Sequence, residues 1–224
     1  LHSFLNEQAP TWREDLANDP EQKPSWLTPT VNDIANKVMT NINNCAAVTS
    51  ITLTALAVLG VERRAIAKNN LIAQLDLYLN LLRKVPYTQG VTVPNESGAE
   101  LLEQAIELEK FTVTNDELGD VISLNTSGAV TMTYYRNNIL HLFALPSLIA
   151  ASLVYKSMTT KQDVSELVSG LYPLIKNELF LGFEQEQLAR YIENVLEQMA
   201  ASNLITIDDN RIAIVAANKT QLII

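Results

Sequence analysis

The sequence predicts an α+β fold that is mostly α-helical, a helical bundle with a small antiparallel meander and a C-terminal helix and hairpin. Two observations carry this prediction. The 224 residues include only seven glycines and eight prolines, which is little turn-forming material for a fold of many short strands. Apolar residues recur at helical spacing along most of the chain, whereas the spacing changes to two between residues 111 and 133.

The composition excludes several classes of protein. Hydrophobic residues make up 47% and charged residues 18%, which fits neither a disordered chain nor a bundle of membrane helices. Sixteen basic and 25 acidic residues give a net charge of −9, and the few neighbouring cations (Arg63, Arg64, Lys68) are too sparse for a nucleic-acid-binding surface. The single cysteine, Cys45, cannot form a disulfide within the chain, which is typical of a reducing compartment.

Residues 1–30 are expected to form an irregular strap, because four prolines recur there and proline interrupts helices. Thr28 and Pro29 then suit the start of a helix, with threonine as the cap and proline in the first turn. Apolar residues at helical spacing follow from Val31, so the first boundary is placed after residue 30.

Residues 31–133 are expected to form a helical subdomain with a short β meander. A helix at about 49–59 is apolar on nearly every side, which predicts that it is buried, and Gly60 suits its C-terminal cap. Ser97 and Glu100 fit a capping box at the start of another helix. Two helices are expected at about 70–83 and 97–109, and a short strand at 91–93.

The meander is predicted from three stretches in which apolar and polar residues alternate. They are Phe111–Thr114, Val121–Leu124 and Val130–Thr133, and turn-forming residues separate them. Three consecutive antiparallel strands are therefore expected between residues 111 and 133.

Residues 137–155 contain no charged side chain and approach the length of about 20 residues that spans a bilayer. Several polar residues interrupt the stretch, and Pro146 lies at its middle. Two buried helices that meet at Pro146 are therefore favoured, and contact with a membrane stays an alternative.

Residues 134–224 are expected to form a C-terminal helical subdomain that ends in a β-hairpin. Helices are predicted at about 163–180 and 184–201, and strands at 204–207 and 211–215. A helix followed by a hairpin resembles the end of a winged-helix module. The turn between the strands is acidic, which disfavours contact with DNA and favours a packing role.

Residue chemistry alone offers one candidate cluster, which joins the expected meander to the uncharged stretch. It contains Tyr134, Tyr135, Arg136, Asn137 and Asn138, with His141 one helical turn further on. Such a junction commonly satisfies buried backbone groups, and contact with a ligand, a lipid headgroup or a neighbouring domain is the alternative. His141 lies among apolar residues, so a hydrogen-bonded core histidine is favoured over a general base. No metal site and no cofactor motif is expected.

The segment Met132–Ala150 resembles the C-terminal region of the bacterial membrane-bound glycerol-3-phosphate acyltransferases. Four shorter segments support the resemblance and follow in the family's order: Pro24–Pro29, Gln74–Leu79, Leu81–Tyr87 and Leu118–Leu124. Together they cover most of residues 24–150.

The resemblance implies the first acylation of phospholipid synthesis, at the cytoplasmic face of the bacterial inner membrane. An acyl group would pass from acyl-CoA or acyl-acyl-carrier-protein to the 1-hydroxyl of sn-glycerol 3-phosphate, without a metal or other cofactor. The implied partners are an upstream catalytic domain of the same chain, these two substrates and the membrane lipids, with no nucleic acid.

The family's His-x-x-x-x-Asp motif, in which the histidine is the general base, is missing here. Glu7 stands five residues after His2, and Pro146 stands five after His141. The family's Phe-x-Glu-Gly-x-Arg-Ser block is missing too. We therefore expect a catalytic domain before Leu1, no catalytic residue in this chain, and no acyltransferase activity of the chain alone.

The expected role of the chain is to pack against the catalytic domain, to help dock the protein on the membrane, or to shape access for the acyl donor. The alternative is a stand-alone helical, winged-helix-like module that binds another protein. The charge of −9 and the C-terminal hairpin are compatible with that alternative.

Overall fold

The structure is a computed structural model that describes residues 2–18, 23–115, 117, 119–155 and 158–223. Helices predominate and two small antiparallel sheets accompany them, which confirms the predicted α+β, mostly helical class. The chain divides into two compact units, residues 1–42 and 43–224. The expected subdomains 1–30, 31–133 and 134–224 stay a prediction, which limited proteolysis would test.

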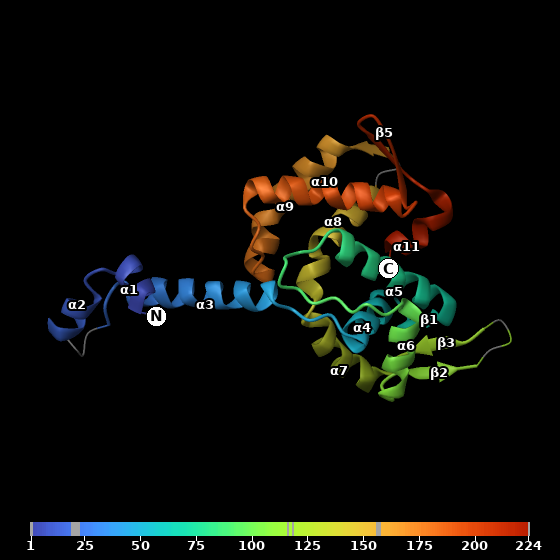
Figure 1. Ribbon diagram of the computed structural model, residues 1–224, viewed down its shortest axis with the longest axis horizontal. Coiled ribbons are helices and arrows are strands. Elements are labelled where there is room, and N and C mark those ends of the chain that lie inside the picture. The colour runs from blue at the N-terminus through green and yellow to red at the C-terminus, as the bar shows by residue number, and fades with distance from the viewer. Residues whose placement is uncertain (1, 19–22, 116, 118, 156–157, 224) are drawn as a thin grey trace. The chain divides into compact units, whose positions relative to one another are not determined.

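The first unit contains α1 (His2–Gln8), α2 (Trp12–Asn18) and most of α3 (Leu27–Asn44) (Figure 1). Helices α1 and α2 correct the expectation of an irregular strap. Pro10 lies between them and Pro24 lies before α3, so these prolines separate helices instead of preventing them. Pro29 lies in the first turn of α3, where its missing N–H costs nothing.

In the second unit, α4 (Ser50–Gly60) packs against α5 (Lys68–Lys84), α6 (Gly98–Glu107) and α7 (Thr126–Asn137) (Figure 1). Helix α4 is buried nearly all round, as its composition predicts. A capping box between Thr49 and Thr52 starts it, and Gly60 is its last residue instead of its cap. The predicted Ser97–Glu100 capping box starts α6.

The first sheet differs from the predicted meander. Its strands are β1 (Ala65–Ala67), β2 (Thr112–Thr114) and β3 (Val121–Ser123), in the order β1-β3-β2. The third expected strand, Val130–Thr133, lies instead inside α7.

The start of α7 explains the change from strand to helix. The Asn125 side chain caps α7 by accepting a hydrogen bond from the Gly128 N–H at 2.7 Å. Ala129 and Met132, three residues apart, then face the core. The expected strand at 91–93 is reduced to one isolated bridge between Ala47 and Thr92.

The uncharged stretch folds as the end of α7 and one continuous helix, α8 (Leu140–Tyr155), which contains Pro146. The expected break at Pro146 is therefore wrong, because the chain turns earlier, at residues 138–139. Leu142, Leu145 and Ile149 are almost completely buried on both sides of the proline. This packing holds α8 together although proline removes one hydrogen bond.

Among the described residues, no single helix is long and apolar enough to cross a membrane. The pair Thr126–Asn137 and Leu140–Val154, bent by 92°, passes that test of length and composition.

The C-terminal part contains β4 (Met158–Thr160), α9 (Lys161–Leu179), α10 (Gln185–Ala201), β5 (Ile205–Asp208), β6 (Arg211–Ile214), a 3₁₀ turn (Ala216–Asn218) and α11 (Lys219–Ile223). The predicted hairpin is present as β5 and β6. Strand β4 pairs with β6 to complete an antiparallel sheet in the order β4-β6-β5. The winged-helix resemblance stays a prediction.

Candidate functional site

The candidate cluster lies where α7 ends and the chain turns into α8. The Asn138 N–H donates to the Tyr135 carbonyl at 3.2 Å, and the Ile139 N–H donates to the Arg136 carbonyl at 3.1 Å. These bonds close the C-terminus of α7 and set the bend between the two helices. The turn therefore separates the tyrosines and Arg136 from His141.

The α7 side of the cluster faces solvent. Tyr134 is 73% exposed and Val130, one turn before it, is 74% exposed, so the two form an apolar patch on one face of α7. Tyr135 is half-buried against the core. Arg136 donates from Nε and Nη2 to the Asn137 side-chain oxygen, at 3.2 and 3.0 Å.

A polar hollow of about 280 Å³ adjoins this patch. Arg64 and Arg136 both line it, and neither forms an ion pair with a described residue. Arg64 follows α4 at a left-handed backbone position, with φ of 50°. Two guanidinium groups without an ion pair to a described residue thus lie beside exposed apolar side chains, although the whole chain carries a charge of −9.

His141 lies in the core, 5% exposed. Its Nε2 is 3.0 Å from the Asn43 carbonyl oxygen, and the edge of the Tyr87 ring packs on it with centroids 5.3 Å apart. Burial lowers the pKa of His141, and the hydrogen bond to Asn43 opposes part of that effect. A carbonyl oxygen accepts, so the neutral imidazole donates from Nε2 to it, and this contact joins α8 to the end of α3.

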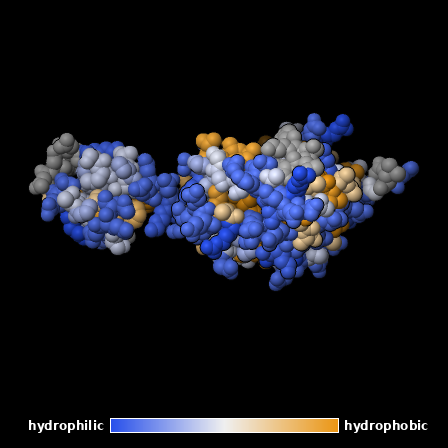
Figure 2. All heavy atoms as spheres, turned by 90° about the horizontal axis from the view of Figure 1, so that it is seen from above, coloured by the Kyte–Doolittle hydropathy of each residue, from blue (hydrophilic) through white to orange (hydrophobic). Residues whose placement is uncertain are grey.

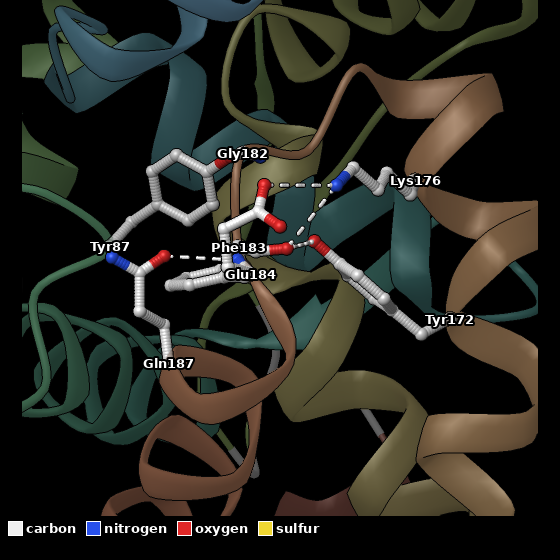
Figure 3. Close-up of polar contacts among 7 residues, drawn as sticks. All are labelled: Tyr87, Tyr172, Lys176, Gly182, Phe183, Glu184 and Gln187. Carbon is white, nitrogen blue, oxygen red and sulfur yellow. Dashed lines mark hydrogen bonds and ion pairs between the residues drawn. The ribbon is translucent and has the colours of Figure 1, made fainter.

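Sequence reasoning missed a network around Tyr87 (Figure 3). The Gly182 N–H donates to the Tyr87 hydroxyl at 3.1 Å, and the Tyr172 hydroxyl donates to the Phe183 carbonyl at 2.7 Å. Burial raises the pKa of Tyr172 to about 12, so it stays a neutral donor. No local pattern indicates this network, because its members come from the loop after α5, from α9 and from the α9–α10 turn.

Lys176 completes the network at its exposed side. Its Nζ lies 3.5 Å from Glu184 Oε1 and 3.4 Å from the Phe183 carbonyl. The Glu184 N–H donates to Gln187 Oε1 at 2.9 Å, which starts α10 (Figure 3). These contacts join the loop after α5, α9 and the α9–α10 turn within the chain, which is typical of a structural network.

Within the part of the chain that the structure describes, no group of three or more His, Cys, Asp or Glu side chains could hold a metal ion.

The predicted cluster is divided by the turn between α7 and α8. It consists of an exposed surface on α7 and a buried histidine, His141, that contacts the Asn43 carbonyl.

Comparisons with known proteins match the whole chain. The model of the family described as "Glycerol-3-phosphate acyltransferase C-terminal region" matches residues 1–223. A glycerol-3-phosphate acyltransferase of Shewanella pealeana is 49% identical over 224 residues, which cover 100% of this chain and 27% of that protein. The Shewanella halifaxensis protein of the same name is 48% identical over the same span.

The Shewanella loihica protein of that name is 51% identical over 208 residues, which cover 93% of this chain and 26% of that protein. The chain thus spans about a quarter of the length of the curated relatives it matches. Because the family model matches nearly every residue, the chain belongs to the family of glycerol-3-phosphate acyltransferase C-terminal regions.

Proposed function

We propose that this chain is the non-catalytic C-terminal region of an enzyme that acylates sn-glycerol 3-phosphate. The whole enzyme transfers an acyl group from acyl-CoA or acyl-acyl-carrier-protein to the 1-hydroxyl, and so begins phospholipid synthesis. The observation that carries this proposal is the match of residues 1–223 to a family described as the C-terminal region of that enzyme.

The environment of His141 supports a non-catalytic role. A general base must reach the proton that it removes, within about 3 Å or through one water. The Nε2 atom of His141 is already bonded to a backbone carbonyl, and its side chain is buried. The residues that catalyse acyl transfer are therefore expected in a catalytic domain upstream in the whole protein. We propose that this domain is the partner of the present region.

An assay of thiol release tests the proposal. The whole protein and the 224-residue chain are each given palmitoyl-CoA and glycerol 3-phosphate, and free CoA and lysophosphatidic acid are measured. We expect turnover by the whole protein and none by the chain alone. If the chain alone turns these substrates over and His141→Gln abolishes that turnover, the proposed non-catalytic role is wrong.

The exposed surface on α7 suggests how the region contributes. We define the α7 surface as Val130, Tyr134, Arg64 and Arg136, and propose that it contacts the anionic cytoplasmic face of the inner membrane. An exposed aromatic and an aliphatic side chain suit the bilayer interface, and each arginine contributes about 1 kcal/mol at an anionic surface. On the face that Figure 2 shows, apolar residues gather in patches on a surface that is otherwise largely hydrophilic.

Co-sedimentation with vesicles tests the membrane contact. Vesicles that contain phosphatidylglycerol are compared with vesicles of phosphatidylcholine alone. We expect the chain to bind the anionic vesicles. Arg64→Gln should reduce this binding roughly fivefold, and the double variant with Tyr134→Ser should reduce it further. Leu174→Ser is the matched control, because Leu174 is 67% exposed on a different helix, α9. Equal losses for Tyr134→Ser and Leu174→Ser would contradict the proposed surface.

A further inference from the structure

A cavity of about 430 Å³ lies among α5, α8, α10 and α11 in the second unit. Its inner wall contains Phe143, Met199, Leu204 and Leu222, all buried. Small residues of α8 widen it at the other side, where Ala151 lines the cavity and is itself exposed. The cavity therefore opens to the surface beside α8.

One polar atom of this wall has no hydrogen-bond partner among the described residues. It is Oε1 of Gln74, a side chain that is 1% exposed and lines the cavity. Its Nε2 donates to the Gln221 carbonyl at 3.3 Å, which fixes the direction of the amide. An unpartnered buried acceptor costs about 1–3 kcal/mol, so a donor supplied by a ligand would be stabilising here.

The size of the cavity suits a hydrocarbon chain. A cavity of about 150 Å³ lined by apolar side chains binds benzene, and ligand pockets range from about 300 to 1,000 Å³. By proportion, about 430 Å³ takes roughly three times as many carbons as benzene, which is the size of a long alkyl chain.

The charge of the wall restricts the head group of such a ligand. Among the described residues that line the cavity, none is an Asp, Glu, Lys, Arg or His. A charged head group would lose its hydration there without gaining a partner, whereas a hydroxyl can donate to Gln74 Oε1. A neutral head group that carries a donor therefore fits the cavity.

We propose that this cavity binds a neutral single-chain lipid, whose alkyl chain lies along the apolar wall and whose hydroxyl donates a hydrogen bond to Gln74 Oε1. The chemical class is that of fatty alcohols and monoacylglycerols. This binding requires no acyl transfer and no membrane contact by the α7 surface, so it stands or fails separately from the proposed function.

Displacement of a fluorescent probe tests the proposal on the 224-residue chain. Diphenylhexatriene is a neutral, rod-shaped hydrocarbon whose fluorescence rises in an apolar site. Its displacement is measured with octanol, decanol and dodecanol, and with the methyl ether of decanol, which keeps the chain and lacks the donor. We expect affinity to rise about fourfold per methylene, and decanol to bind about tenfold more tightly than its ether.

Two variants locate the binding. Ala151→Trp places a large side chain at the opening and is expected to reduce probe binding at least tenfold. Ala189→Trp is the matched control, because Ala189 is an exposed helical alanine of α10 that does not line the cavity. Gln74→Leu removes the acceptor at similar volume, so the alcohol and the ether are expected to bind this variant equally.

Three results would overturn the inference. The first is the absence of probe binding by the unaltered chain, and the second is equal binding by Ala151→Trp and Ala189→Trp. The third is equal affinity of the unaltered chain for decanol and its ether, which would show that Gln74 does not recognise the head group. Circular dichroism of each variant shows that the helices are intact.

Discussion

The burial of His141 is expected to make this protein less stable as the pH falls below neutrality. Burial lowers the pKa of the folded-state imidazole below its ordinary value of 6.5. The unfolded chain therefore binds a proton at this residue more readily than the folded chain does. The stability that neutral His141 confers is present above pH 6.5 and is lost as the pH falls through the folded-state pKa.

The magnitude follows from proton linkage. One proton taken up on unfolding changes the free energy of unfolding by at most about 1.36 kcal/mol per pH unit. Replacement by glutamine keeps a side-chain donor near the Asn43 carbonyl and removes the titration. His141→Gln is therefore expected to lower stability by about 1 kcal/mol at neutral pH through lost packing on Tyr87. Below pH 6.5 its stability should fall less steeply than that of the unaltered protein.

Urea unfolding followed by circular dichroism, at a series of pH values on both sides of 6.5, measures this difference. His2→Gln is the control, because His2 is exposed near the N-terminus and belongs to the other unit. Parallel pH dependences for His141→Gln and the unaltered protein would refute the reasoning, since they would show that buried His141 does not contribute to the linkage.

Three other substitutions test the packing of the helices, each by urea unfolding. Gly98→Ala is expected to destabilise the protein by about 1–3 kcal/mol, because its Cβ would lie 2.7 Å from the Ile72 carbonyl oxygen and 2.9 Å from the Asp76 nitrogen. Gly170→Ala in α9 should instead stabilise it by about 0.5–1 kcal/mol, since a Cβ there meets nothing within 4 Å. A loss for Gly170→Ala equal to that for Gly98→Ala would contradict this geometry. Ser97→Ala removes a capping hydrogen bond of α6 and should cost about 1 kcal/mol, and unchanged stability would show that the cap contributes nothing.

Sequence patterns predicted an element correctly where the interactions that form it join residues a few positions apart. The Ser97–Glu100 pair fixed the start of α6, and the uniformly apolar stretch at 50–60 identified a buried helix. Helices α9 and α10 and the hairpin that follows were predicted to within a few residues. Capping bonds, helical periodicity and turn-forming residues depend on neighbours in the chain, so sequence patterns record them.

Two predictions failed where a local pattern was ambiguous. Alternation at Val130–Thr133 suits a strand, but the Asn125 cap and the burial of Ala129 and Met132 give a helix. Pro146 suits a helix end, but the apolar surroundings of α8 keep the helix continuous. In both cases burial against other segments favoured the helix, joined at α7 by the local Asn125 cap.

The sequence by itself determined the class of fold, most of the helices of the second unit and, through the Met132–Ala150 segment, the family. Tertiary structure alone decided which strands complete the two sheets, since β1 and β4 come from outside the predicted meander and hairpin. It also decided that His141 contacts Asn43 and that Gln74 lines a cavity with a mainly apolar wall. Such contacts join residues far apart in the chain, and their free energy depends on the whole folded core, so no local pattern encodes them.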